Sequence, residues 1–383
     1  MAISRARAFG APGKYIQGPG EYENLETFAS SYGDNTFYLI DSFLFDEIAA
    51  RIQKIYASTA SKYVTEPFRG ECSYAEIERV TERVRTAGAT VVVAMGGGKT
   101  LDTGKMVAMA MNIPLIIAPT SASTDAPCSA MSVIYTDDHQ YIGCVFHKRN
   151  PDLVLVDTEM IAKAPLRMFR AGMGDALSTY YEALANERTD GVNYVGSGYR
   201  RTRASVAMAE LAREILLEDG AKALRALACG AITEAVENVI EANILLGAQF
   251  ENAGSSVAHA VHGALTALPA THKYLHGEKV AFGIVVQLVL ENYPEAELAE
   301  AVKWLISLDL PVTLDQLDVE ASEANISLLA EALAGEKSRA RAVPMWITRR
   351  LLHDAIKAAD RTGRDFRENF QGRAWPRGSE YGK

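Results

Sequence analysis

Apolar runs alternate with amphipathic stretches over the first part of the chain. Stretches whose apolar positions have helical spacing cover residues 43–57, 74–87 and 100–111. Short apolar runs that are typical of buried strands lie before, between and after them, at residues 36–40, 62–65, 90–95 and 114–118. Strands that alternate with helices along a chain predict a mainly parallel sheet.

The pattern changes after Asp125. Apolar runs at residues 132–135 and 141–146 flank a turn-rich segment and predict a hairpin, and residues 153–156 predict a strand that returns to the sheet. From about Pro165 onward the spacing is helical, in segments at residues 173–186, 203–217, 222–249, 256–267 and 280–291 and in shorter ones to 359. We therefore expect the second half of the chain to be all α.

These patterns predict two domains and a tail. We expect an α/β domain at residues 1–163, an all-α domain at residues 164–360 and a polar tail at residues 361–383. A length of 383 residues fits two domains of ordinary size. The tail has arginines among glycines and prolines and little to bury, so we interpret it as a polar segment rather than an interaction arm.

The charge balance and the cysteine spacing narrow the class of protein. With 39 Lys and Arg against 48 Asp and Glu, the net charge of −9 disfavours nucleic acid and anionic lipid surfaces as partners. No apolar segment is long enough for a membrane helix or a signal peptide. The 4 cysteines are widely spaced, which favours reduced thiols over disulfides. We expect a globular cytoplasmic protein.

A glycine-rich turn, Gly96-Gly97-Gly98-Lys99, follows a predicted strand and opens a predicted helix. Glycines let the backbone approach a ligand closely, and a helix start offers unpaired N–H groups and a positive dipole end to a pyrophosphate. A Walker A loop would need glycine where Val93 stands, and the G-x-G-x-x-G spacing is also absent. Anion binding and a tight structural turn are the two interpretations of this segment.

A polar loop follows the next predicted strand, at the edge where open α/β sheets bind ligands. It contains Thr120, Ser123 and Asp125. Asp41 ends the first predicted strand, and a carboxylate there can accept the hydroxyls of an adenosine ribose and would repel a 2′-phosphate, which favours NAD over NADP. The structural alternatives are an ordinary polar loop and, for Asp41, a helix N-cap.

Histidines cluster in the helical half of the chain, where one stretch contains His259, His262, His272 and His276. His259 and His262 share a helical face, and the breaker Pro269 lets His276 fold back toward them. Such clustering favours a metal site over satisfied structural histidines. Asp175 lies upstream in a first helical turn, where the helix dipole alone explains an acidic residue, and spacing does not connect it to the histidines.

Five motifs run in order across the chain, excluding the tail. They are GGGKTLDTGK at 96–105, PTSASTDAP at 119–127, SVIY at 132–135, GMGDALST at 172–179 and HKYLHGEK at 272–279. Together they resemble the glycerol dehydrogenases of the iron-containing alcohol dehydrogenase superfamily. The resemblance implies a dehydroquinate-synthase-like architecture, with an α/β NAD-binding domain followed by an all-α, metal-binding catalytic domain.

The resemblance also implies roles for individual residues. Asp175, His259 and His276 would bind a catalytic zinc ion, and Asp125 would hold a substrate hydroxyl. The implied NAD site is formed by Asp41, Gly96, Gly97, Gly98, Lys99, Asp102, Thr120, Ser123, Ser129, Met131 and Tyr135. Relatives of this kind also suggest a homo-oligomer.

Two positions depart from the family pattern. The iron enzymes of this superfamily have a histidine ligand one helical turn after the aspartate, where this chain has Thr179. Three protein ligands and an open position suit catalytic zinc, so zinc is expected rather than iron. Gly263 and Ala264 follow His262 where many glycerol dehydrogenases resemble Asn-Gly, which leaves the surroundings of the metal and the substrate preference open.

We expect NAD-dependent oxidation of glycerol and related vicinal diols, with glycerol giving dihydroxyacetone by zinc-assisted hydride transfer. The alternative on the same fold is a reductase of 2-oxo acids, for which Lys148 or Arg149 would supply the cationic partner. Two other classes are a nucleotide-binding phosphotransferase, which the missing Walker glycine argues against, and a non-catalytic metal-binding regulator.

Overall fold

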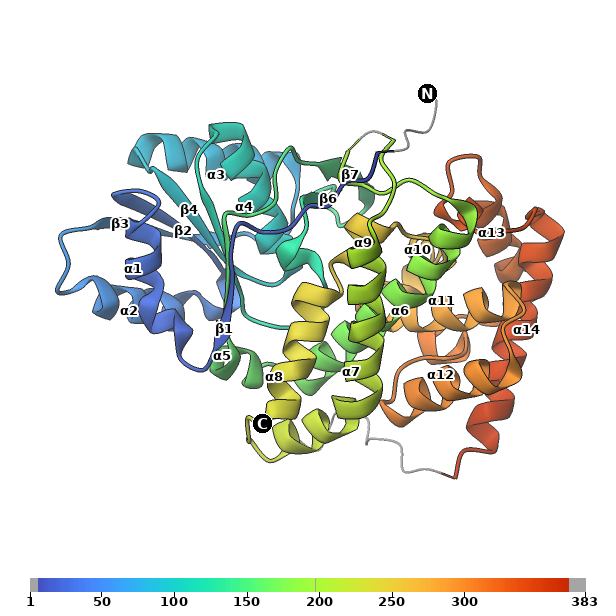
Figure 1. The fold of residues 1–383 in the computed structure, drawn as a ribbon. Coiled ribbons are helices and arrows are strands. Elements are labelled where there is room, and N and C mark those ends of the chain that lie inside the picture. The colour runs from blue at the N-terminus through green and yellow to red at the C-terminus, as the bar shows by residue number, and fades with distance from the viewer. Residues whose placement is uncertain (1–5, 197, 372–383) are drawn as a thin grey trace. The chain divides into compact units, whose positions relative to one another are not determined.

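The computed structural model describes residues 6–196 and 198–371, which form two compact units (Figure 1). The first unit contains residues 10–164 and 230–232, and the second contains the described residues among 1–9, 165–229 and 233–383. Residues 6–9, which we expected in the α/β domain, belong to the helical unit, where Ala8 N donates a 3.1 Å hydrogen bond to Arg200 O. The predicted tail covers residues 361–383, and residues 372–383 of it lie outside the described residues.

The first unit is built on a six-stranded sheet with the order β1-β8-β5-β4-β2-β3, in which every pairing is parallel. Its strands are β1 (Tyr15–Gly18), β2 (Asn35–Asp41), β3 (Lys62–Phe68), β4 (Val91–Gly96), β5 (Leu115–Pro119) and β8 (Leu153–Asp157). Every residue of β4, β5 and β8 is buried, as expected for strands covered on both faces. The predicted parallel sheet is confirmed, and the half-buried edge strand β1 is an addition to it.

The strand register brings the ends of three neighbouring strands to one edge of this sheet. Gly96 at the end of β4 pairs with Pro119 at the end of β5, and Asp41 ends β2 on the other side of β4. Thr120 N then donates a 3.1 Å hydrogen bond to Gly96 O, which extends the pairing by one residue. This carboxyl edge is where ligands bind in open parallel sheets.

Helices and a hairpin complete the first unit. The helices are α1 (Leu25–Ser30), α2 (Phe45–Tyr56), α3 (Tyr74–Ala87), α4 (Gly98–Met111) and α5 (Thr158–Ala162). Helix α3 begins where the Ser73 side chain accepts the N–H of Glu76, and it ends at Gly88, whose φ of 61° lies in the left-handed region. The predicted hairpin is confirmed as an antiparallel pair, β6 (Met131–Tyr135) and β7 (Tyr141–Phe146).

The second unit is helical, as predicted. Its α-helices are α6 (Leu166–Thr189), α7 (Arg203–Ala228), α8 (Glu234–Glu241), α9 (Gln249–Ala253), α10 (Val257–Leu265), α11 (His276–Leu290), α12 (Glu295–Ser307), α13 (Glu323–Ala334) and α14 (Arg349–Glu368). Helix α11 is buried almost along its whole length, and α6, α10, α12 and α14 pack against it (Figure 1).

The boundaries predicted for the helices at residues 203–217 and 222–249 are wrong. Helix α7 continues through Gly220, where a Cβ would lie only 2.5 Å from the Met173 side chain, so glycine there permits close packing. The helix ends at Ala228 because Gly230 adopts a left-handed φ of 74°, and α8 begins after Thr233. The predicted continuous helix at 222–249 is therefore interrupted, and its later part contains a π-helical segment, Ala242–Leu246.

The predicted tail starts inside a helix, because α14 extends to Glu368. Arg364 lies 2.8 Å from Asp360 and 3.0 Å from Asp315, and Arg367 lies 3.2 Å from Asp315. Gly363 is buried against the Val312 carbonyl, which leaves no space for a Cβ. Residues 361–368 thus differ from the prediction, since Arg364 and Arg367 have a partner far away in the sequence, Asp315, that the local pattern does not reveal.

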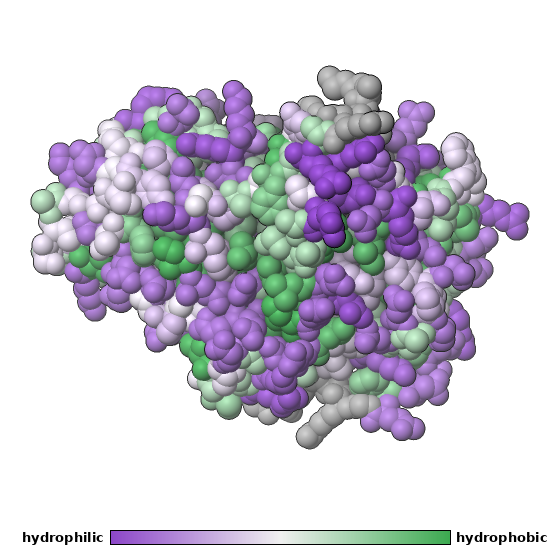
Figure 2. Space-filling view, viewed as in Figure 1, coloured by the Kyte–Doolittle hydropathy of each residue, from purple (hydrophilic) through white to green (hydrophobic). Residues whose placement is uncertain are grey.

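The surface seen in Figure 2 is mainly hydrophilic, with smaller apolar areas between the charged side chains. Such a mixture is normal, because a folded protein has too few polar atoms to cover its whole surface. Among the described helices, none has the length and apolar character needed to cross a bilayer.

Candidate active site

Three side chains from separate helices converge in the helical unit. Asp175 lies in α6, His259 in α10, and His276 is the first residue of α11. One potential ligand atom from each lies within 4.8 Å of the others. Asp175 Oδ1 is 3.3 Å from His259 Nε2 and 3.0 Å from His276 Nε2. The structure therefore brings together the three residues that the sequence resemblance grouped.

Close packing of α6 against α11 produces part of this convergence. A Cβ on Gly277 would lie 1.8 Å from Ala171 O, and one on Gly174 would lie 2.9 Å from Gly277 O, so both positions require glycine. Arg167 of α6 also pairs with Glu278 of α11 at 2.6 Å. These contacts hold the start of α11, and with it His276, beside the buried Asp175.

The donor set fits a divalent metal ion. One carboxylate and two imidazoles form a typical catalytic zinc set, and donor atoms about 2.0–2.1 Å from a tetrahedral ion lie roughly 3.3 Å apart. The observed separations of 3.0 and 3.3 Å between Asp175 Oδ1 and the two imidazole nitrogens match this spacing. Asp175 is fully buried, whereas the His276 side chain is 32% exposed, so the group is accessible from one side.

The charges in this group are strongly coupled. Burial would raise the pKa of Asp175, but the neighbouring imidazoles of His276 and His259 hold it well below its usual range. Burial would lower the pKa of His259, but the carboxylates of Glu182 and Asp175 on either side raise it to about 10. The surroundings therefore favour positive charge between the two carboxylates, which a proton or a metal cation can supply.

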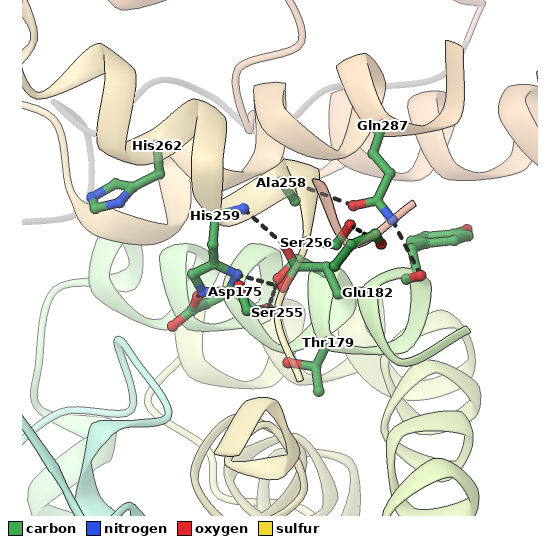
Figure 3. Close-up of polar contacts among 12 residues, drawn as sticks. Asp175, Thr179, Glu182, Ser255, Ser256, Ala258, His259, His262 and Gln287 are labelled. Carbon is green, nitrogen blue, oxygen red and sulfur yellow. Dashed lines mark hydrogen bonds and ion pairs between the residues drawn. The ribbon is translucent and has the colours of Figure 1, made fainter. Parts of the chain in front are cut away.

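Two further side chains contact His259 and His276. The sequence analysis gave Glu182 no role and placed His262 only in the histidine cluster. Glu182 Oε2 is 2.7 Å from His259 Nδ1 (Figure 3). His262 Nε2 is 3.1 Å from His276 Nδ1. Glu182 follows Asp175 by seven residues and so lies on the same face of α6. That spacing is the one sequence feature that could have identified it.

The other polar residues of this region have structural partners. Thr179, which stands where iron enzymes have a fourth ligand, donates a 3.1 Å hydrogen bond to Gly247 O. His272 is exposed and its ring contacts Thr266 O at 3.1 Å, so it lies apart from the three converging side chains.

In the α/β unit, the glycine-rich turn lies at the carboxyl edge of the sheet. A Cβ on Gly96 would lie 2.7 Å from the Thr100 side chain and 3.0 Å from that of Asp41, so packing requires glycine at this position. A Cβ on Gly97 would meet nothing within 4 Å, and one on Gly98 would have only ordinary contacts. Gly97 is also the N-cap of α4, so open space lies in front of the unpaired N–H groups of a helix start.

Asp41 acts as the N-cap that the sequence analysis gave as its structural alternative. Its Oδ1 accepts the N–H of Phe43 at 3.0 Å, and its Oδ2 accepts a hydrogen bond from Thr100 at 3.3 Å. The carboxylate therefore caps the turn after β2 and also lies beside the start of α4. A capping carboxylate still has lone pairs for ribose hydroxyls, so the two roles are compatible.

Helix α4 is tied to the hairpin by buried charges. Asp102 accepts the N–H of Val133 at 2.9 Å and pairs with Lys105 at 3.1 Å. Lys105 is almost fully buried, and its ammonium also contacts Ala126 O, Ser129 Oγ and Met131 O. The sequence interpretation missed Lys105, although it stands three residues after Asp102 in the first motif. These contacts link α4 to the hairpin and involve Asp102, Ser129 and Met131.

The remaining predicted cofactor residues lie along the same edge and hairpin. Lys99 pairs with Glu71 at 2.6 Å, and its ammonium lies 5.2 Å from the centre of the Tyr135 ring. Ser123 contacts Ser121 at 3.2 Å in the loop after β5. Thr120 and Asp125 are buried in that loop, with Asp125 preceding the short 3-10 turn Ala126–Cys128.

Comparison with known proteins identifies the family of this chain. The family model for iron-containing alcohol dehydrogenases matches residues 12–158. A glycerol dehydrogenase of Escherichia coli is 41% identical over 95% of this chain and all of that protein, and a glycolaldehyde reductase of Halobacterium salinarum is 39% identical over 94% and 99%. The crystal structure of a probable glycerol dehydrogenase from Sinorhizobium meliloti has a TM-score of 0.89 and 43% identity, covering 94% of this chain and 99% of that one. This chain is therefore an oxidoreductase that belongs to the iron-containing alcohol dehydrogenase family.

Proposed function

We propose that this chain catalyses the NAD-dependent oxidation of glycerol to dihydroxyacetone and accepts related vicinal diols. The observation that carries the proposal is the convergence of Asp175, His259 and His276, which form a donor set for a divalent cation. The chain's similarity over nearly its full length to proteins named glycerol dehydrogenase supports glycerol as the substrate.

We infer that Asp175, His259 and His276 hold a zinc ion. When bound, the ion supplies Lewis-acid chemistry that lowers the pKa of a coordinated alcohol. Three protein donors leave a position for substrate, and the Thr179 hydroxyl is engaged with Gly247 O rather than offered as a fourth ligand. Because Asp175 is fully buried and the His276 side chain is 32% exposed, substrate would reach a bound ion from the His276 side.

The proposed NAD site uses the carboxyl edge of the sheet. The open backbone at Gly97 and Gly98 and the N-terminus of α4 suit the pyrophosphate, with Lys99 as a nearby cation. The Asp41 carboxylate would accept the adenosine ribose hydroxyls and disfavour NADP. The remaining predicted contacts are Gly96, Asp102, Thr120, Ser123, Ser129, Met131 and Tyr135.

The buried Asp125 is proposed to accept a hydrogen bond from a second hydroxyl of the polyol. Such a contact would distinguish a vicinal diol from a simple alcohol, because a site built to hydrogen-bond a substrate hydroxyl discriminates against a substrate that lacks it. The alcohol would lose a hydride to the nicotinamide ring and a proton to solvent or a nearby base, which balances the reaction.

A second candidate substrate comes from the comparisons. The glycolaldehyde reductase relative is almost as similar to this chain as the glycerol dehydrogenase is, at 39% against 41% identity. Glycolaldehyde also carries its hydroxyl next to the carbonyl, so the same metal and carboxylate contacts would serve it.

The structure gives no support to either cation suggested for the 2-oxo acid alternative. Arg149 donates a 2.6 Å hydrogen bond to Ile113 O, which precedes β5 and therefore lies at the amino edge of the sheet. The candidate cofactor loops lie at the opposite, carboxyl edge. Lys148, the other candidate, is exposed on the surface. For this reason we do not propose a 2-oxo acid as the substrate.

A direct assay tests the proposed function. The purified chain is mixed with NAD and glycerol or ethylene glycol, and with NADH and dihydroxyacetone, glycolaldehyde or a 2-oxo acid, before and after treatment with a zinc chelator. We expect turnover of glycerol and dihydroxyacetone that the chelator abolishes and added Zn²⁺ restores. A preference for glycolaldehyde would select the second candidate, and activity that survives complete metal removal would contradict the metal mechanism.

A further inference from the structure

A second buried carboxylate lies behind one of the proposed metal ligands. Glu182 is fully buried, and its two oxygens make different contacts with the same residue of α10. Oε2 is 2.7 Å from His259 Nδ1, and Oε1 accepts the backbone N–H of His259 at 2.9 Å (Figure 3). One carboxylate therefore holds both the ring and the backbone of this histidine.

This contact determines which ring nitrogen can bind a metal. A carboxylate can only accept, so His259 Nδ1 must donate its proton to Glu182. In the neutral ring the lone pair then lies on Nε2, the atom that faces Asp175 at 3.3 Å. The carboxylate thus selects the tautomer that exposes Nε2 as a ligand.

The same carboxylate changes the charge of the site. Asp175 and Glu182 are both fully buried, one on each side of the His259 ring. Two buried negative charges are costly unless matching positive charge lies beside them. A divalent cation matches both, while the two histidines remain neutral ligands.

A simpler role for Glu182 is to cap α10. The helix begins after Ser256, whose side chain makes no capping hydrogen bond. Two other buried side chains accept its first N–H groups: Gln287 Oε1 accepts from Ala258 at 3.1 Å, and Glu182 Oε1 accepts from His259. Gln287 and Glu182 therefore share the capping role, but Glu182 also contacts the imidazole ring (Figure 3). Gln287 also donates hydrogen bonds to Tyr181 O and Glu291 Oε1, and it provides a control that caps the same helix without the imidazole contact.

We propose that Glu182 is a positioning residue of the metal site, which orients His259 through Nδ1 and supplies the second negative charge that balances a divalent ion. This inference rests on the proposed metal site at Asp175, His259 and His276. It assigns a function to a residue that contacts neither the substrate nor the ion.

The Glu182→Gln variant tests whether Glu182 orients the His259 ring, because it keeps the size of the side chain and the cap of α10. The glutamine has nearly the same size and can still accept the His259 N–H, but its amide NH₂ then faces Nδ1. The ring would move its proton to Nε2 to accept that bond, and the metal would lose a ligand. Loss of such an outer contact commonly weakens metal binding by about 10- to 100-fold.

The test is Zn²⁺ binding to the full metal-free chain, measured by competition with a chromophoric chelator. It compares the wild type with Glu182→Gln, Glu182→Asp, Gln287→Met and His259→Ala, and thermal unfolding of each metal-free protein monitors folding. We expect Glu182→Gln to bind Zn²⁺ about 10- to 100-fold more weakly. Glu182→Asp should recover part of that loss because it keeps the charge, and Gln287→Met should keep wild-type affinity even where its unfolding temperature falls.

The outcomes separate this inference from the function on which it rests. A wild-type chain that binds no Zn²⁺ would overturn the metal site and the inference with it. A Glu182→Gln chain with wild-type affinity, beside a His259→Ala chain that has lost binding, would overturn the inference alone. Equal losses in Glu182→Gln and Gln287→Met would also overturn it, because a side chain that does not contact the imidazole would then matter as much as Glu182 does.

Discussion

The two candidate binding regions of this chain are built in opposite ways. In the helical unit, side chains from α6, α10 and α11 converge, and their buried charges depend on one another. In the α/β unit, the candidate cofactor edge consists largely of backbone at strand ends and of glycines with open space in front of them. The first region is suited to a small, highly charged ion, and the second to an extended anion that needs many N–H donors.

This difference predicts that the two regions can be disabled separately. Side-chain removal should destroy the metal group without changing the parallel sheet, because the two regions belong to different compact units. A side chain added at the glycine edge should block the dinucleotide without changing the metal group. The predictions below test this separation.

The largest effect is expected from His276→Ala. Loss of one of three proposed ligands should remove bound zinc, and without Lewis-acid assistance kcat/KM for glycerol should fall by at least about 1000-fold. NAD binding, followed by protein fluorescence, should stay near the wild-type value because His276 lies in the helical unit. A variant that has no zinc but keeps wild-type turnover would contradict the account.

Gly97→Val should weaken NAD binding and leave zinc binding unchanged. A Cβ at this position meets no protein atom within 4 Å, so the variant should fold normally, but its side chain would fill the space proposed for the pyrophosphate. We expect the Kd for NAD to rise at least about tenfold, while zinc content stays unchanged. Unchanged NAD affinity, measured by titration calorimetry, would place the dinucleotide elsewhere.

Asp41→Gly should have a smaller effect on cofactor choice. Removing the carboxylate removes repulsion of the 2′-phosphate, so the ratio of kcat/KM for NAD over NADP should fall by about tenfold, which corresponds to about 1.4 kcal/mol. The lost cap of Phe43 should cost only a few tenths of a kcal/mol, since glycine is itself tolerated at N-caps. Steady-state kinetics with both cofactors checks this, and an unchanged ratio would leave Asp41 with capping alone.

The last effect is on stability rather than on activity and concerns His147, which contacts Ser132 at 2.8 Å in the α/β unit. Burial, and then the charge of Lys105, lower the pKa of His147 from 6.5 to about 4. The unfolded chain therefore binds this proton first, so the free energy of unfolding should decrease as the pH falls from 6.5 toward 4, by at most about 1.4 kcal/mol per pH unit.

Urea unfolding at several pH values measures that slope. Other groups titrate in the same range, so the comparison is between the wild type and His147→Gln, which has no proton to gain. The variant should lose less stability than the wild type as the pH falls. Equal slopes for both proteins would contradict the assigned direction of the His147 pKa.

Local patterns predicted the α/β half of the fold well. Buried strands such as β4 are continuous apolar runs, and the alternation of strands and helices is visible within short windows. The candidate edge at Gly96 and Thr120 follows from such local features, because parallel strands end at the same edge of a sheet. In contrast, the half-buried strand β1 has too weak a pattern to be identified.

Features that depend on distant partners could not be predicted in this way. The resemblance grouped Asp175 with His259 and His276, but the spacing alone did not. Glu182 and Lys105 were missed because their partners belong to other elements. Arg364 and Arg367 pair with the distant Asp315, so a stretch that seemed to have little to bury is the end of α14.

The most direct test of the central claim is anomalous diffraction at the zinc absorption edge from crystals of the purified chain. We predict one strong peak, about 2.0–2.2 Å from Asp175 Oδ1, His259 Nε2 and His276 Nε2. Crystals grown with zinc that show these three side chains in place, but no anomalous peak between them, would contradict the claim that they form a metal site.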